Sequence, residues 1–397
     1  MAGESFVGGL GGLGGLGGLG GLGGLGGLGG LGGLGGLGGL GGLGGLGGLG
    51  GLGVSDSPAA AEALIRTRDG IVGPFSPPGP PPTNLPANST SNLERWEPWV
   101  RASVFDFELV SHLGFLPGAP YAALRHLTAG VIYRPLAEIS RPSMTQFANY
   151  LVFLDSYADL RPDRAPEILT QMGGALTFLS AIPFLHPTRT RYTLELLSTV
   201  LRLANFAEMR FKHSLASRRP NEFSPQVQPI IQTPSHSSFP SGHATEAFAA
   251  AYVLWRLLVA TGVAPYAGSS NANKWRVQLM RLASRVAVNR TVAGVHFPVD
   301  SAAGCFLGIQ LGRYFWKRCT AGAATTYGAY RFVGSLFPWG GPTPLDGDFY
   351  WEPIFRRLHG LATIPPTPYV VSISNPLVAA PSPILRWLWD KALGEWP

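Results

Sequence analysis

Apolar side chains recur every three or four positions through most of the chain between about residues 118 and 318, and this spacing predicts amphipathic helices. The pattern is clearest in residues 141–160, 167–182, 190–219 and 243–318. The last of these ranges is interrupted at residues 263–273. A polar, proline-rich loop over 221–240 separates the two helical blocks, and the region from 335 onward predicts loops with one or two short helices. Strand-like alternation is scarce. The pattern therefore predicts an all-α fold with a helical bundle at its core.

The first part of the chain has a different composition. Residues 8–52 are an unbroken Gly-Gly-Leu repeat of fifteen units, which holds more than half of the 55 glycines. Because glycine disfavours helix and leucine every third residue drifts around a helix axis, we expect residues 1–53 to form a disordered low-complexity tail. A membrane- or surface-associated tail is the alternative. The proline-rich residues 54–97 are interpreted as a linker, and 98–397 as one helical domain with its motifs at about 200–315.

The charge of the chain limits its partners. The net charge is +7 and the isoelectric point is near 9.6. Since no run of Lys and Arg resembles a nucleic-acid-binding tail, a small anionic ligand is expected and nucleic acid is not. The first basic residue is Arg66, so no secretory signal is recognised, and no run of about 20 apolar residues predicts a spanning helix. We therefore expect a soluble, cytoplasmic protein without membrane-spanning segments.

Two segments before and after the central loop carry candidate anion-binding groups. In KHSLASRRP, Lys212 and Arg219 are seven residues apart, which would place both cations on one face of a helix end. In PSGH, Ser241, Gly242 and His243 open the next helix, whose first N–H groups can bind an anion. Glycine lets the backbone approach a ligand closely. Taken singly, the first segment is typical of a solvated helix face and the second of a helix cap.

A third segment, NRTVAGVHFPVD, contains Arg290, His296 and Asp300. Pro298 predicts the start of a helix just after His296. Asp300 follows His296 by four residues and can accept a hydrogen bond from the far ring nitrogen of that histidine. A single histidine with such an aspartate is commonly structural. In order along one chain, however, the three segments supply three cations, a hydroxyl, backbone donors and two histidines, which suit a tetrahedral oxyanion.

These three segments resemble the signature of the superfamily of type 2 phosphatidic acid phosphatases and vanadium haloperoxidases. The resemblance covers about residues 120–315, and Asn289 departs from the serine that many members have before the arginine. It implies a helical fold in which Lys212, Arg219 and Arg290 neutralise the oxyanion, and Ser241 and the Gly242 N–H complete its cradle.

The resemblance implies two chemistries for the same histidines. In the phosphatase branch, His296 is the nucleophile that forms a phosphohistidine, His243 protonates the leaving alcohol, and Asp300 orients His296. In the haloperoxidase branch, vanadate is the cofactor, with His296 as its axial ligand, His243 assisting peroxide, and halide being oxidised by hydrogen peroxide.

The soluble bromoperoxidase-like branch is the prediction taken forward. The stretch TPSHSSFPSGHAT is similar to the corresponding stretch of vanadium bromoperoxidases, in which a histidine at the position of His236 lines the halide pocket. Met209 is the second halide-pocket candidate, although many members of that branch have tryptophan there. A homo-oligomer, common in this branch, is left open. The alternatives are a soluble acid phosphatase that hydrolyses phosphate monoesters and a non-catalytic anion-binding or surface-display protein.

Overall fold

The computed structural model describes residues 58–73, 79–118, 121–128, 132–173, 176–320, 325–339, 347–363 and 366–396. The Gly-Gly-Leu repeat lies outside the described residues, so its predicted disorder and the division into tail, linker and domain stay predictions. The α-helices are α2 (Pro58–Ile71), α3 (Pro98–Val110), α4 (Met144–Asn149), α5 (Leu151–Ala158), α6 (Arg161–Gln171), α7 (Leu176–Ser180), α8 (Arg191–Leu215), α9 (Gly242–Ala260), α10 (Ser269–Val292), α11 (Pro298–Thr320), α12 (Trp351–Leu358) and α13 (Pro383–Leu393). The 3₁₀ turns are η7 (Thr90–Arg95), η8 (Pro220–Glu222), η9 (Pro225–Val227) and η10 (Gly334–Leu336).

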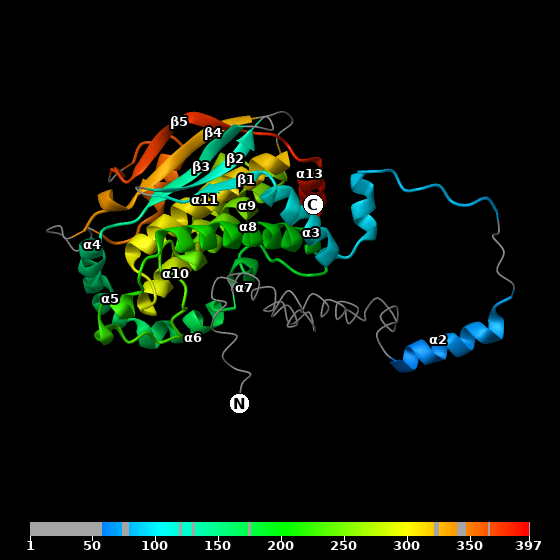
Figure 1. The fold of residues 1–397 in the computed structure, drawn as a ribbon, viewed down its shortest axis with the longest axis horizontal. Helices are drawn as coiled ribbons and strands as arrows, with labels where there is room; N and C mark the ends of the chain where they lie inside the picture. Colours follow the sequence, from blue (N-terminus) through cyan, green and yellow to red (C-terminus); the bar gives the residue numbers. More distant parts are fainter. Residues whose placement is uncertain are drawn as a thin grey trace.

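The prediction of an all-α fold is wrong, because a five-stranded mixed sheet covers one side of the helices (Figure 1). The strands are β1 (Leu113–Leu116), β2 (Ala122–Thr128), β3 (Ile132–Ser140), β4 (Thr325–Val333) and β5 (Val370–Ala379). They lie in the order β1-β2-β3-β4-β5; β3 and β4 are parallel, and the other neighbours are antiparallel.

Two of the strands, β2 and β3, are hard to detect because each contains a run without alternation between buried and exposed positions. Residues 122–124 of β2 are all buried, as are residues 136–139 of β3. Short buried runs of this kind, in which most side chains are apolar, cannot be distinguished from buried helix by periodicity. The pairing of β3 with β4 also joins segments nearly 200 residues apart, for example Ala137 with Tyr330. Local sequence holds no signal for such a pairing.

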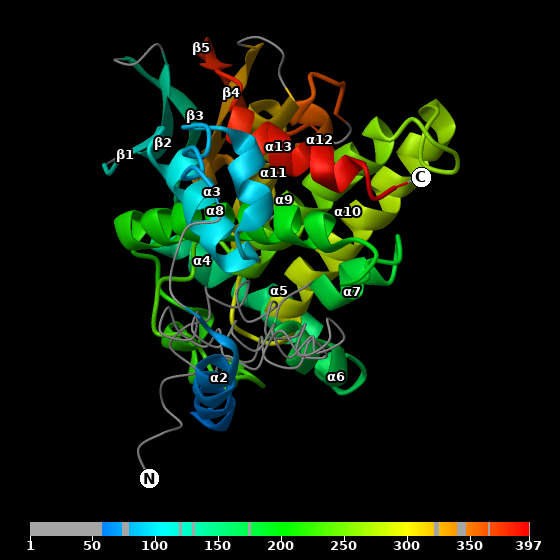
Figure 2. The ribbon, with the colours of Figure 1, turned by 90° about the vertical axis from the view of Figure 1, so that its right-hand side faces the viewer.

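The predicted helices after residue 190 are confirmed in their main lines, whereas residues 141–182 form four short helices, α4 to α7, where two longer ones are predicted. The long amphipathic stretch forms α8, and the second block forms α9, α10 and α11, with the expected interruption between α9 and α10. These four helices form the centre of the molecule, and β2 and β3 of the sheet lie against α8 and α11 (Figures 1 and 2). No helix in the described ranges is long and apolar enough to cross a membrane.

The end of α8 differs from the prediction in a way that matters for the site. The helix ends at Leu215, and Ala216 adopts a left-handed conformation with φ 46° while its N–H donates to the carbonyl of Lys212. Arg219 then has extended backbone, with φ −81° and ψ 155°. The following residue, Pro220, disfavours helical conformation at Arg219. The predicted common helix face of Lys212 and Arg219 is therefore wrong, and a turn brings Arg219 to its place.

Three glycines bring α9 and α11 close together. Gly304, Gly308 and Gly312 recur every four residues along one face of α11, and a Cβ at each would collide with α9. At Gly308 the added atom would lie 2.4 Å from the carbonyl oxygen of Thr245. Since α9 starts at Gly242 and α11 starts just after His296, this close packing sets the distance between the two candidate motifs.

Replacing Gly308 with alanine is expected to lower the free energy of unfolding by about 1–3 kcal/mol, because backbone rather than a flexible side chain blocks the new methyl group. Gly394→Ala is the matched control, since its added Cβ comes no closer than 3.5 Å to any atom. Denaturant titration of both variants measures the difference. Equal stabilities would show that α9 and α11 can separate without cost.

Candidate active site

The lysine and arginine of the first motif meet at the loop before α9. Lys212 is 1% exposed, and its Nζ donates to the carbonyl oxygens of Ser237 at 3.1 Å and Ser238 at 3.2 Å. Arg219 donates from Nε to the carbonyl of His236 at 3.0 Å and from Nη1 to that of Val295 at 2.9 Å. Backbone carbonyls orient both cations without neutralising them, so their charge remains available to an anion.

His296 is held between Asp300 and Arg219. Its Nδ1 lies 3.0 Å from Asp300 Oδ2, as predicted from the four-residue spacing, and its Nε2 lies 3.0 Å from Arg219 Nη1. A guanidinium can only donate, so Nε2 accepts and the ring proton sits on Nδ1, from where it is donated to Asp300. Burial, and after it Arg219, keeps the pKa of His296 well below its usual value. The ring is therefore neutral, with the lone pair of Nε2 turned toward the cations.

Asp300 is fully buried and has further donors. The N–H of Phe297 donates to Oδ2 at 3.0 Å, and the hydroxyl of Ser238 donates to the same oxygen. The N–H of Ser241 donates to the Asp300 carbonyl at 3.0 Å. Burial raises the pKa of the carboxyl to about 6, although the hydrogen bonds from Ser238 and Phe297 act to lower it. The carboxylate thus holds the ring of His296 and ties the start of α11 to the start of α9.

The PSGH motif opens a helix as predicted. Ser241 is the N-cap of α9, its hydroxyl accepts from the N–H of Ala244, and Gly242 is the first helical residue. His243 follows, and its Nε2 is buried without a hydrogen-bond partner among the described residues. Burial, and then Arg290, lowers the pKa of His243 well below its usual value. The ring is neutral while no anion is present.

Arg290 is the cation with the most free donors. It is 1% exposed, and its Nη2 donates to Gln171 Oε1 at 2.8 Å and to the Ile168 carbonyl at 3.3 Å. Its Nε and Nη1 find no partner in the part of the chain that the structure describes. The Asn289 side chain, the departure noted in the motif, donates to the same Gln171 oxygen at 3.0 Å. Asn289 and α6 thereby orient Arg290.

The two halide-pocket candidates differ in position. The Nδ1 of His236 lies 3.0 Å from Arg219 Nη2, so this residue joins the site, and burial lowers its pKa to about 3. Met209 is half-buried on α8, and it is the preceding residue, Glu208, whose carboxyl lies against Gly242. The structure therefore brings His236 to the other motif residues and shows no such contact for Met209 within the described ranges.

Three contributors to the site were missed by the sequence analysis: Ser238, Gln171 and Glu208. Ser238 lies inside the stretch that contains PSGH, and Glu208 is one helical turn before Lys212, so their positions were visible although their roles were not. Gln171 comes from α6, more than 110 residues before Arg290. Nothing in the local sequence could have indicated that contact.

Together these residues form a buried cationic site suited to a tetrahedral oxyanion. Lys212 and Arg219 act on both neutral histidines, and Arg290 acts on His243. The unpartnered donors of Arg290 and the unpartnered Nε2 of His243 can form hydrogen bonds with a polar ligand. Such a site can bind an oxyanion, attack it with His296 Nε2 and exchange a proton through His243.

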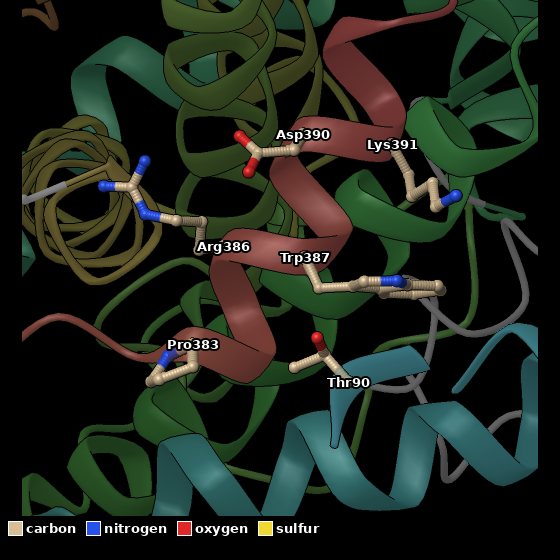
Figure 3. A pocket seen from close by; sticks show the side chains of 6 residues that line it. All are labelled: Thr90, Pro383, Arg386, Trp387, Asp390 and Lys391. Carbon is tan, nitrogen blue, oxygen red and sulfur yellow. The ribbon is translucent and has the colours of Figure 1, made fainter. Parts of the chain in front are cut away.

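A separate cleft lies beside α13. It has a volume of about 480 Å³ and is lined by Thr90, Pro383, Arg386, Trp387, Asp390 and Lys391 (Figure 3). Arg386 donates to the Thr320 carbonyl, and Lys391 pairs with Glu94 at 2.6 Å. None of the motif residues lines it, so this cleft is not the candidate active site.

Comparison with known proteins supports the same region of the chain. The family model of the PAP2 superfamily matches residues 193–321, which run from α8 to just beyond the end of α11 and include every predicted catalytic and oxyanion-binding residue. No curated protein matches the sequence. One similar solved structure is the first transmembrane PAP2-type phosphatidylglycerolphosphate phosphatase from Bacillus subtilis, with 22% identity, a TM-score of 0.34, and coverage of 45% of this chain and 89% of that chain.

The predicted PAP2 resemblance is therefore confirmed over residues 193–321, and the match supports an enzyme. The family match does not confirm the haloperoxidase branch, which was the main prediction from the sequence.

Proposed function

We propose that the chain is a PAP2-type phosphatase that hydrolyses phosphate monoesters through a phosphohistidine at His296. The observation that carries the proposal is the orientation of His296, whose Nδ1–H faces Asp300 while its Nε2 lone pair faces Arg219. A neutral imidazole with its basic nitrogen directed at an anion-binding cation is ready to attack phosphorus. The family match over the same residues supports the phosphatase in preference to the haloperoxidase.

Binding of the phosphate group relies on the three buried cations. Arg290 supplies its two unpartnered donor nitrogens, Nε and Nη1, and Arg219 exchanges its bond to His296 Nε2 for one to a phosphate oxygen. Lys212 contributes a third charge, and the start of α9 adds the Gly242 N–H and the Ser241 hydroxyl. These donors stabilise the charge that spreads over the equatorial oxygens during transfer.

Transfer proceeds in two displacements at phosphorus. In the first, His296 Nε2 forms the P–N bond, the P–O bond to the alcohol breaks, and His243 gives its proton to the leaving oxygen. In the second, His243 takes a proton from water, the water oxygen bonds to phosphorus, and the P–N bond breaks. Bound phosphate offsets the effect of Arg290 on His243, so substrate binding raises the pKa of that ring and prepares it as an acid.

Asp300→Asn is expected to lower kcat by about 10²-fold or more, because the amide carries no charge to stabilise the imidazolium formed on His296. Oxyanion binding should change little, since Asp300 does not face the ligand. Steady-state hydrolysis of an aryl phosphate measures kcat, and tungstate titration measures binding. An unchanged kcat would remove Asp300 from the proposed mechanism.

The phosphatase is tested with one purified sample treated to remove metals and vanadate. It receives an aryl phosphate and is quenched in alkali, where phosphohistidine survives. We expect phosphate release and a base-stable labelled protein. A sample that binds tungstate but never releases phosphate from any ester would contradict the proposal.

A vanadium haloperoxidase is the second candidate, favoured by His236, whose ring lies against Arg219 inside the site. The residues present fit vanadate: the free donors of Arg290 and the lone pair of His296 Nε2 suit an anion that takes a nitrogen ligand. Lys212, Arg219 and Arg290 would hold its oxygens, and His296 Nε2 would supply the nitrogen ligand. Bound vanadate would supply activation of hydrogen peroxide toward halide.

The two candidates separate in a second arm of the same assay. A portion of the metal-free sample receives orthovanadate, hydrogen peroxide, bromide and a halogen acceptor. Halogenation far above that of free vanadate, without phosphate release in the first arm, would favour the haloperoxidase. His236→Ala should then lower bromide oxidation specifically.

A further inference from the structure

Glu208 is a buried acid that the proposed mechanism does not use. It lies on α8, is 0% exposed, and neither of its carboxyl oxygens has a hydrogen-bond partner among the described residues. A Cβ placed on Gly242 would lie 2.5 Å from Glu208 Oε1. The carboxyl group therefore lies against the first residue of α9, where the sequence analysis expected glycine to leave room for an anion.

The charges around Glu208 come from several elements. Lys212, one turn further on α8, and Arg219 act on Glu208 directly, while Asp300 of α11 and Glu246 of α9 act on Lys212. Burial raises the pKa of Glu208, and Lys212 and Arg219 oppose that rise without cancelling it. Glu208 and Lys212 form no ion pair within 4 Å in the described chain. The neutral acid is thus the form that this site favours.

A neutral carboxylic acid carries one O–H donor, which here has no acceptor. A buried polar group without a partner destabilises a folded protein, so each such group requires an explanation, and a bound ligand is one. A tetrahedral oxyanion at the start of α9 would bring an acceptor oxygen. Ionised, the same carboxylate would stand beside that anion and repel it.

We propose that Glu208 is a further binding residue of the oxyanion site: as the neutral acid it donates a hydrogen bond to a bound oxyanion oxygen, and as the carboxylate it excludes the anion. This inference rests on the oxyanion site of the proposed function and requires no turnover. It makes anion binding dependent on proton uptake by one defined residue.

The experiment is calorimetric titration of the full chain with tungstate, whose own charge stays constant between about pH 6 and pH 9, where carboxyl groups and lysines of this kind titrate. The dissociation constant of the wild type should rise by up to about tenfold per pH unit above the pKa of Glu208. Repeating the titration in buffers of different ionisation enthalpy counts the protons taken up. At the highest pH of this range, the wild type should take up about one proton for each anion bound.

Glu208→Gln keeps the shape and a donor while removing the charge. At every pH it should bind tungstate with the affinity that the wild type has at low pH. The proton that the wild type takes up at Glu208 should no longer be taken up. Glu208→Met removes donor and charge together, so its binding should also lack that uptake but be weaker than that of the glutamine variant. Glu138→Gln is the control, because Glu138 is a buried glutamate of β3 whose carboxylate pairs with Arg331 away from the motifs. It should retain the wild-type pH dependence.

If proton uptake persisted unchanged in Glu208→Gln, the proton would bind Lys212 or another group, and the inference would be overturned. Equal affinities of the glutamine and methionine variants would overturn the donor role. Binding that follows the expected pattern in a protein without phosphate release would instead refute the proposed function and leave this inference standing. Circular dichroism of each variant verifies that it is folded.

Discussion

Replacing His296 with glutamine is expected to lower kcat for phosphate release by at least about 10⁴-fold, because the proposed covalent intermediate forms on the ring of His296 and glutamine has no nucleophilic nitrogen. Glutamine retains polar groups that can face Arg219 and Asp300, which hold the ring in the native protein at 3.0 Å on either side. The affinity for tungstate should therefore stay within about threefold of the wild type. Rapid-quench labelling should find no phosphorylated protein.

The control for this variant is His213→Gln, an exposed histidine at the end of α8. It should leave both kcat and the labelled intermediate unchanged. If His296→Gln still formed a base-stable phosphorylated protein, a different residue would be the nucleophile. If it lost tungstate binding as well as turnover, His296 would be needed to assemble the anion site itself.

Replacing Arg290 with methionine is expected to weaken tungstate binding by about 30- to 1,000-fold, which corresponds to about 2–4 kcal/mol. The reason is that two buried donor nitrogens of Arg290, Nε and Nη1, find no partner among the described residues, so the anion can accept from both at once. Burial, which Glu167 opposes, lowers the pKa of this guanidinium to about 10. The charge is therefore costly to the free protein.

The same variant should leave the stability of the anion-free protein unchanged or raise it. A buried, incompletely bonded cation is replaced by an apolar chain of similar length, and such replacements are often neutral or stabilising. Thermal unfolding without anion, compared with calorimetric titration, measures the two effects. Arg281→Met, at an exposed position of the same helix, should change neither. Loss of both stability and binding would make Arg290 a structural residue.

The histidine pair indicates how the site depends on its ligand. Both rings are neutral in the free protein because burial and the neighbouring cations lower their pKa values. In the proposed mechanism a neutral His296 attacks, whereas His243 must be protonated to act as an acid. A bound anion would allow both forms, because its negative charge offsets the cations nearest to His243 and raises the pKa of that ring.

The sequence by itself determined the helices and the identity of the motif residues. Apolar periodicity is a local property, and it predicted α8, α9, α10 and α11 in their order. The four-residue spacing of His296 and Asp300, with a proline between them, was enough to predict their hydrogen bond, because both lie at one helix start. Family resemblance at the same motifs agrees with the match over residues 193–321.

Only the tertiary structure decided the sheet and the support of the site. The parallel pairing of β3 with β4, the approach of Gln171 to Arg290 and the position of Glu208 against Gly242 each join residues on separate elements. Strands buried without alternation resemble helix in a local window, and a contact across elements depends on how whole helices pack. Periodicity and spacing depend on neighbours along the chain. They therefore predicted the candidate site residues and missed Ser238, Gln171 and Glu208, which contact those residues from elsewhere in the fold.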